Sequence, residues 1–264
     1  MRLQKHIKPI AFLVILLHSS LQAQDYRLKL GVGVASLYYP DYIGSRSTQL
    51  LTLPIPYIRY KGENFRIDKD GLSSKLLGVN GLKIDLSVSG SLPANSESNG
   101  VREGMPNLDL TAEIGLKLVY NLFEKGVSKL EFELPVRAVL STDFTNIKYR
   151  GVVSNPQLRY SLNYNEFEWT FRTGLVFTNQ EYNSYYYEVK KEYETSSRNA
   201  YDVSGGFSGF KNRVGMTYQK DSWWAGAFVS YYDVTNAVFK DSPLVETKQA
   251  LYSGVSIAYV FYTQ

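Results

Sequence analysis

Two glutamates in the middle of the chain have a spacing that acid–base chemistry could use. Glu131 and Glu133 are two positions apart, so both carboxylates point to the same side of an extended segment. Paired carboxylates can act as general acid and general base. Lys129 and Arg137 lie on that same side, and mixed charges this close together favour ion pairs over proton transfer. We therefore interpret the four residues as a salt-bridge network.

Histidine and cysteine, which often supply catalytic bases and nucleophiles, are scarce. The chain has no cysteine, and its only two histidines are His6 and His18. Hydrolases and acyltransferases mostly use histidine to activate serine or water, because imidazole titrates near neutral pH. The sequence therefore predicts a protein that is not an enzyme, with no catalytic, cofactor-binding or metal-binding residues and no cofactor.

Both histidines fall in a segment that is typical of a secretory signal. Three basic residues precede the apolar run 11–17, and Ala23 ends a plausible cleavage site. A helical membrane anchor needs about 20 apolar residues, so this run is too short to be one. We expect residues 1–23 to be a signal peptide that is removed, and residues 24–264 to form a single domain.

The expected mature chain is nearly neutral. The full sequence contains 29 lysines and arginines and 25 acidic residues. Three of the basic residues, Arg2, Lys5 and Lys8, and none of the acids lie before residue 24, which leaves a net charge of +1. Binding to nucleic acid requires a basic patch, so we expect no nucleic-acid partner.

Apolar and polar residues alternate over long stretches, which indicates β-strands with one apolar face. The even positions of 108–122 are apolar, whereas the odd positions include Asp109, Glu113 and Lys117. The pattern recurs over 130–140 and 167–177. Runs of about ten to fifteen residues exceed the usual strand of a soluble sandwich and suffice for a tilted strand to cross a bilayer. The sequence therefore predicts a transmembrane antiparallel up-and-down β-barrel in contact with outer-membrane lipid.

We expect about twelve strands, with ten as the alternative. Short turns such as Asn80-Gly81 and 124–126 alternate with longer polar connections, as in bacterial barrels with short periplasmic turns and long outer loops. Two of the segments are too short to span, which is why ten spanning strands is the alternative. The expected strands are 28–38, 49–60, 64–69, 72–78, 82–92, 107–122, 127–142, 148–164, 166–178, 201–219, 223–234 and 248–262.

Charged residues on the polar face of these strands would line the lumen. Their signs are nearly balanced, which favours pairing across the bore, whereas a porin selective for one ion sign would carry a one-sided ring. Long side chains can fill much of a barrel of this size, so we favour a mostly filled lumen over an open channel. The predicted lumen network consists of Lys83, Asp85, Asp109, Glu113, Lys117, Lys129, Glu131, Glu133, Arg137, Arg159, Glu168, Arg172 and Arg213.

The connection 179–200 is rich in tyrosine and in charges of both signs. Exposed tyrosines with mixed charge are typical of recognition surfaces. The alternative for residues 185–187 is an aromatic belt at the lipid boundary. Residues 95–100 read as a mobile polar loop, and Arg102 has no predicted role. The candidate recognition residues are Tyr182, Tyr185, Tyr186, Tyr187 and Tyr193.

Four stretches, in order along the chain, resemble the MltA-interacting protein/OmpV (MipA/OmpV) family of outer-membrane proteins. Residues 31–45 (GVGVASLYYPDYIGS) and 53–60 (LPIPYIRY) are similar to its first two strands and the loop between them. Residues 186–189 (YYEV) and 236–245 (NAVFKDSPLV) are similar to two later motifs, and 93–165 matches none. The residues that fall on family motifs include Pro40, Asp41, Gly44, Pro54, Pro56, Tyr57, Asp241, Ser242 and Pro243.

This resemblance implies an outer-membrane protein of a Gram-negative bacterium that binds partners rather than catalysing a reaction. The named member of the family is a scaffold that holds a peptidoglycan polymerase and a lytic transglycosylase together, so these are the implied partners. An adhesin or a porin-like channel for small solutes is the alternative. The motif prolines and the Asp-Ser-Pro turn are interpreted as structural.

Overall fold

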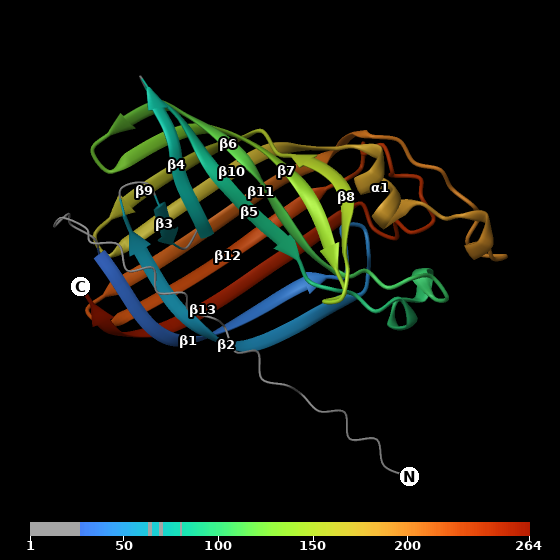
Figure 1. The fold of residues 1–264 in the computed structure, drawn as a ribbon, viewed down its shortest axis with the longest axis horizontal. Helices are drawn as coiled ribbons and strands as arrows, with labels where there is room; N and C mark the ends of the chain where they lie inside the picture. Colours follow the sequence, from blue (N-terminus) through green and yellow to red (C-terminus); the bar gives the residue numbers. More distant parts are fainter. Residues whose placement is uncertain (1–26, 63–64, 69–70, 80) are drawn as a thin grey trace, which may run out of the picture.

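The wall of the protein is a closed β-barrel. The structure is a computed structural model that describes residues 27–62, 65–68, 71–79 and 81–264, so the expected signal segment 1–23 lies outside the described residues. Thirteen strands of this part of the chain form one antiparallel sheet. The first strand, β1 (Arg27–Pro40), pairs with both β2 (Thr48–Lys61) and the last strand, β13 (Gln249–Thr263), which closes the barrel (Figure 1). The predicted fold class is confirmed.

The remaining strands follow one another around the wall in chain order. Two of them, β8 and β9, both pair with β7 and with β10, so they are two segments of one path across the sheet. Counted in this way the wall has the twelve strands that were predicted. The bounds are β3 (Phe65–Asp68), β4 (Gly71–Val79), β5 (Leu82–Ser91), β6 (Leu110–Lys125), β7 (Ser128–Thr142), β8 (Ile147–Ser154), β9 (Gln157–Tyr164), β10 (Phe167–Thr178), β11 (Gly206–Lys220) and β12 (Trp223–Asp233).

The break between β8 and β9 corrects the expectation of one continuous strand over 148–164. It falls at Asn155-Pro156, beside Pro135 of β7. Proline has no N–H to donate to the ladder, so two neighbouring prolines interrupt the hydrogen-bond pattern. The side-chain amide of Asn155 instead donates to the carbonyl of Leu175 on β10, which anchors the break to the next strand.

The alternation in the sequence corresponds to the two faces of the wall. On β6 the side chains of Ile114 and Leu116 are 46% and 52% exposed, whereas the inward Val119 is 4% exposed. Outward aromatic side chains gather toward the end of the barrel where the turns are short, as in the girdle that marks a membrane interface. They include Tyr120, Phe123, Tyr164, Phe167, Trp169, Trp223, Tyr259 and Phe261.

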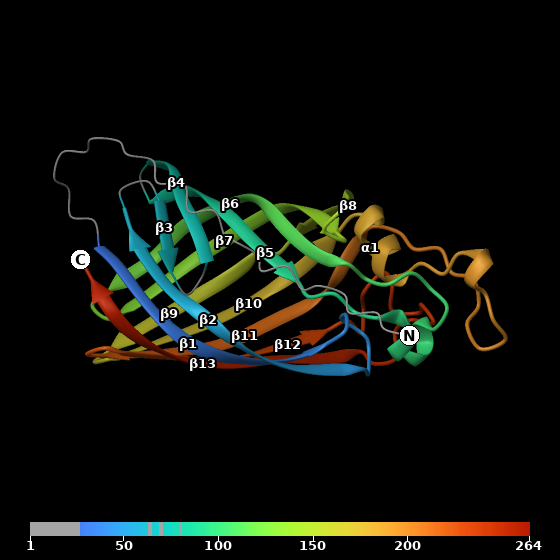
Figure 2. The same ribbon diagram turned by 60° about the horizontal axis from the view of Figure 1, so that its bottom comes forward.

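The two ends of the barrel differ in their connections. At one end turns of two residues join β6 to β7, β9 to β10 and β11 to β12, and in these turns Gly126, Asn165 and Asp221 take the positive φ that tight hairpins require. At the other end the connections are longer and carry the helices (Figures 1 and 2). These are η1 (Ser96–Ser98), η2 (Gly100–Arg102), α1 (Gln180–Tyr187) and η3 (Lys191–Tyr193). In the described part of the chain, none of the helices has the length and apolar character needed to cross a membrane.

Candidate functional site

Glu133 lies at the centre of the charges that fill the lumen. It points inward from β7, and 2% of its surface is exposed. Its carboxylate lies 3.5 Å from Lys117 Nζ, 3.6 Å from a guanidinium nitrogen of Arg159 and 3.9 Å from Arg172 Nε. It also accepts a 2.6 Å hydrogen bond from the side-chain amide of Gln157. One carboxylate therefore joins side chains from β6, β9 and β10.

A second set of contacts extends the network along β7. Glu131 lies 2.8 Å from Lys129 Nζ and 3.9 Å from Arg159, which stands directly opposite it in the register of β7 and β9. Arg159 also lies 3.9 Å from Glu168 on β10. The pairing of strands thus places Arg159 of β9 against anions of both neighbouring strands.

A separate ion pair lies nearer the long-loop end. Arg137 Nε is 2.8 Å from Glu113 Oε2, and the same guanidinium donates to Ser87 Oγ at 3.3 Å. Both side chains are largely buried. A charge-assisted hydrogen bond of this length stabilises both ionised forms.

Three further predicted lumen residues lie on the inner faces of β5 and β11. Lys83 and Asp85 share the inner face because they stand opposite the inward Val119 and Lys117 in the register of β5 and β6. Arg213 lies on the inner face of β11 with its guanidinium 3.9 Å above the ring of Phe228.

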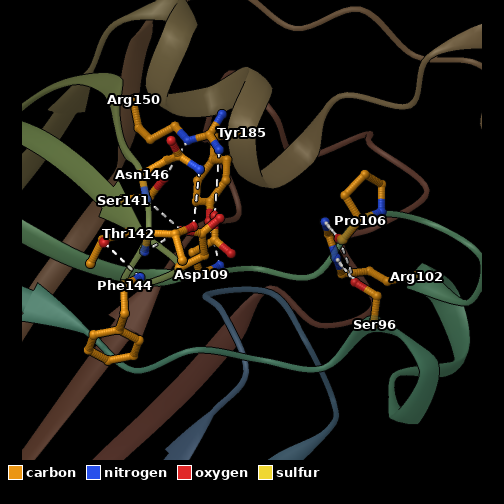
Figure 3. Close-up of polar contacts among 12 residues, drawn as sticks. Ser96, Arg102, Pro106, Asp109, Ser141, Thr142, Phe144, Asn146, Arg150 and Tyr185 are labelled. Atoms are coloured by element: carbon orange, nitrogen blue, oxygen red, sulfur yellow. Dashed lines mark hydrogen bonds and ion pairs between the residues drawn. The ribbon is translucent and has the colours of Figure 1, made fainter.

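Asp109 corrects the prediction, because it lies at the rim rather than on the lumen face of a strand. It precedes β6, its carboxylate is 3.7 Å from Arg150, and its backbone N–H donates to the Tyr185 hydroxyl at 2.7 Å (Figure 3). The Arg150 guanidinium lies 4.2 Å from the Tyr185 ring centroid. The predicted strand 107–122 began three residues early, since the chain reaches β6 only at Leu110.

The loops of the long-loop end fold into a compact unit, which we call the cap. Its core combines side chains from the connections after β1, β5, β10 and β12. The rings of Tyr187 and Phe239 stack with centroids 3.7 Å apart. Leu108, which the alternation assigned to the lipid face, belongs to this core. The core residues are Tyr42, Ala94, Leu108, Tyr186, Tyr187, Val189, Val203, Val234, Ala237, Phe239 and Leu244.

Hydrogen bonds between distant loops tie the cap together. The Tyr42 hydroxyl donates to the carbonyl of Leu244 at 2.7 Å, and the Tyr187 hydroxyl donates to the carbonyl of Ile43 at 2.9 Å. Burial raises the pKa of the Tyr42 and Tyr187 phenols well above their usual value and that of Tyr186 to about 12. All three phenols are therefore neutral at physiological pH.

These contacts correct the prediction for the tyrosines of 179–200. The structure turns Tyr186 and Tyr187 inward on α1, where they are 6% and 3% exposed. Tyr182, Tyr185 and Tyr193 are partly buried against the same core. The cluster therefore forms neither an exposed recognition surface nor an aromatic belt. The sequence did offer a signal for this packing. Tyr182 is three and four positions before Tyr185 and Tyr186, a spacing that places all three side chains on one face of a helix.

Arg102 is a residue whose part in the cap the sequence analysis missed. It is 3% exposed, and its guanidinium donates to the carbonyl of Tyr186. The guanidinium also donates to the carbonyl of Pro106 and to Ser96 Oγ (Figure 3). Burial lowers its pKa from the usual value. The polar loop expected at 95–100 is instead an ordered pair of 3₁₀ turns, in which Ser96 and Asn99 are buried.

Several motif residues build the cap rather than a reactive site. Asp41 accepts hydrogen bonds from the side-chain amides of Asn99 at 2.8 Å and Gln49 at 2.9 Å. Gly44 has a φ of +103°, and its carbonyl accepts the N–H groups of Glu246 and Thr247. Ser242 Oγ donates to the carbonyl of Tyr187 at 2.7 Å.

The remaining motif residues lie elsewhere. Pro54 and Pro56 are on the outer face of β2, opposite Val34 and Val32 of β1. Tyr57 points into the lumen, where its ring centroid is 5.4 Å from that of Trp224. Pro40 lines the cavity described next, Pro243 is partly buried and Asp241 is exposed at the surface of the cap.

Two cavities lie inside the barrel. The larger, of about 290 Å³, lies directly beneath the cap and is lined by Tyr187 and Phe239 together with Lys211 and Arg213. The smaller, of about 180 Å³, lies farther along the bore. Leu37, Arg213 and Phe228 line both, so this group lies between the two cavities. In the part of the chain that the structure describes, no three histidine, aspartate or glutamate side chains form a cluster suited to a metal ion.

Comparison with known proteins connects this architecture to named relatives. Over 209 residues the chain is 25% identical to outer membrane protein OmpV of Vibrio cholerae serotype O1 and 24% identical to outer membrane protein Omp26La of Vibrio anguillarum. Each alignment covers 76% of both proteins.

Two of the similar solved structures are a FadL homologue of Pseudomonas aeruginosa and the outer membrane protease OmpT of Escherichia coli. The FadL homologue has a TM-score of 0.33 and 9% identity over 90% of each chain. OmpT has a TM-score of 0.30 and 10% identity, with 89% of this chain and 96% of that chain covered.

The family match covers most of the barrel. Residues 32–261 match the sequence profile of the family described as MltA-interacting protein MipA. This confirms the resemblance read from the motifs, and the outer-membrane location that it implied agrees with the names of both relatives. The protein is an outer-membrane β-barrel that belongs to the MipA family.

Proposed function

We propose that this protein is a non-enzymatic scaffold that binds enzymes of peptidoglycan synthesis and remodelling at its periplasmic rim. The observation that carries the proposal is that charged side chains and a packed cap occupy the bore. The ion pairs around Glu133 join inward side chains of the neighbouring strands β6, β7, β9 and β10, and the cap lies at the end with the long loops. A barrel obstructed in this way offers surfaces to partners rather than a path to solutes.

The partner class comes from the family. The family is described as MltA-interacting, which supports a lytic transglycosylase as one partner. In outer-membrane barrels the short turns face the periplasm, so a partner in that compartment would meet the short-turn rim. This rim exposes charges of both signs, which suit a polar protein contact. They include Glu124, Lys125, Glu166, Lys220 and Asp221.

The test is retention of purified MltA by the immobilised, detergent-solubilised barrel. We expect the wild-type protein to retain MltA, and the rim variant K125E/E166K/K220E to lose about tenfold or more in affinity because several rim contacts change sign. The matched control is K190E/K191E/E192K, which makes the same change in net charge on the exposed loop after α1. Failure of the wild type to retain MltA would overturn the partner assignment.

A porin-like channel is the second candidate, and the two cavities favour it. They share Leu37, Arg213 and Phe228, so a movement of these side chains would join them. Planar-bilayer conductance separates the two functions. A scaffold with an obstructed bore should conduct little, whereas steady conductance of porin size in the wild type would make the channel the primary function.

A further inference from the structure

The cavity beneath the cap has the composition of a binding site. We propose that it binds a small organic anion that carries one aromatic ring. This inference concerns the lumen and goes beyond the scaffold proposal, which concerns the periplasmic rim. It rests on a lysine that makes no ion pair in the described part of the chain, on the hydrogen bonds already made by the nearby carboxylates and on the aromatic walls.

Lys211 is the cation that the cavity leaves without an anionic partner. It points inward from β11 and lines the cavity. In the described part of the chain Lys211 makes no ion pair, and its Nζ lies 5.1 Å from the centroid of the Tyr232 ring. Removing an ammonium group from water is costly unless it gains a hydrogen-bonded counter-charge. An anion in the cavity would supply that counter-charge.

The two carboxylates of the cavity wall already have donors. Glu113 is held by Arg137 at 2.8 Å, and Asp41 accepts from the amides of Asn99 and Gln49. Arg213, which also lines the cavity, lies 3.9 Å from the Phe228 ring. Because both carboxylates already accept hydrogen bonds, while Lys211 makes no ion pair, the cavity favours an anionic guest over a cationic one.

The walls provide flat apolar contacts for a ring. Tyr232 and Tyr252 have ring centroids 5.5 Å apart, and Tyr182 and Phe239 close the cavity from the cap. Tilted and edge-on contacts between rings at such distances are favourable. A volume of about 290 Å³ is at the lower limit of the roughly 300–1,000 Å³ of small-molecule sites, which suits one ring with a short acidic arm.

The experiment uses benzoate as the probe. We expect isothermal titration calorimetry of the refolded full-length barrel in a zwitterionic detergent to detect saturable binding of benzoate. Benzamide, which has nearly the same shape without the charge, should bind about tenfold more weakly or not at all. Cyclohexanecarboxylate, which keeps the charge without the aromatic ring, should also bind more weakly. Titration into detergent alone corrects for partition into micelles.

Variants assign the binding to this cavity. K211Q should weaken benzoate binding by about tenfold or more, and K211R should restore part of it. Y232L should weaken binding, whereas Y232F should keep it. The matched control is K190Q, which removes a lysine charge from an exposed loop position outside the cavity. All variants are checked for the heat-modifiable gel band of a folded barrel, so a loss of binding is not a loss of folding.

Three results would overturn the proposal. The first is the absence of saturable benzoate binding to the wild-type barrel. The second is equal affinity of folded K211Q and wild type, which would locate the binding elsewhere. The third is equal affinity for benzoate and benzamide, which would show that the cavity does not select an anion. None of these results bears on the rim, so they leave the scaffold proposal to its own test.

Discussion

The lumen network and the cap occupy different parts of the barrel and are held together by different physical means. The network is built from charged side chains of adjacent strands, with Glu133 in contact with Lys117, Arg159 and Arg172. The cap is built from aromatic and aliphatic side chains of loops, with Tyr187 stacked on Phe239. Charge pairs respond to the removal of one partner and to salt, whereas a packed core responds to cavities and to the burial of new charge.

This difference predicts that the two regions can be opened separately. The residues of the network are positioned by the strands of the barrel, whose main-chain hydrogen bonds do not involve the cap. The cap is held by contacts between loops far apart in sequence, such as Tyr42 with Leu244. The variants below test this separation, from the largest expected effect to the smallest.

Phe239→Ala should have the largest effect and should be confined to the cap. The side chain is 2% exposed, and its removal leaves a cavity that costs about 3–5 kcal/mol. Hydrogen exchange should then lose protection in 179–205 and 234–248, while the barrel keeps its heat-modifiable gel band. Phe144→Ala, at an 81% exposed position of another loop, is the control that should change little. Loss of the barrel itself in F239A would show that cap and wall fold as one unit.

Substitution by arginine on the lipid face should have the second-largest effect on stability. Leu116→Arg, Leu134→Arg or Phe171→Arg should each cost about 2–4 kcal/mol if the residue lies near the middle of the bilayer. Lys129→Gln and Glu168→Gln, on the inner face, should matter less for assembly. Unfolding by denaturant in lipid vesicles measures the difference. Equal tolerance of the two sets would contradict the assignment of the faces.

The strands and the cap also differ in how far the sequence predicted them. Long alternation over 108–122 and 130–140 predicted both the strands and their faces, because side chains of a strand alternate regardless of its partners. The partners were not predicted. The balance of charge had favoured pairing across the bore, whereas register brings Glu131 opposite Arg159 on the neighbouring strand, and Arg137 pairs with Glu113 instead of with Glu131 or Glu133.

The cap could not be predicted in this way, because its contacts join residues that local periodicity does not relate. Nothing in the local sequence of Arg102 relates it to Tyr186, 84 positions later, whose carbonyl it binds. Tyrosines among charged residues read as an exposed loop, whereas tertiary packing buries them. The break at Asn155-Pro156 could have been predicted from the sequence, since proline is unfavourable inside a strand.

Alkaline pH should destabilise the folded cap by about 2–3 kcal/mol. The pKa of Tyr186 rises from its ordinary value of 10.0 to about 12 through burial, so the folded cap favours the neutral phenol. Its contribution to stability is complete below pH 10 and is lost as the pH rises toward 12. Hydrogen exchange of the cap against pH measures the transition. Tyr186→Phe should keep its protection to higher pH, and an identical transition in both proteins would exclude Tyr186 as the titrating group.

The smallest change in stability, about 1–2 kcal/mol, should come from Glu131→Ala combined with Glu133→Ala, because the lumen is polar and water can replace part of the lost contacts. The effect on the bore should be clearer. Without the two carboxylates, Lys117, Arg159 and Arg172 outnumber Glu168, the carboxylate that stays beside Arg159, so planar-bilayer recordings should show a leak that favours anions. The preference should fade at high salt as screening shortens the reach of the charges. Glu97→Ala combined with Glu192→Ala, at two exposed loop positions outside the network, is the matched control. A wild type that already passes ions freely, with only its selectivity altered in the double variant, would show that the network does not obstruct the bore.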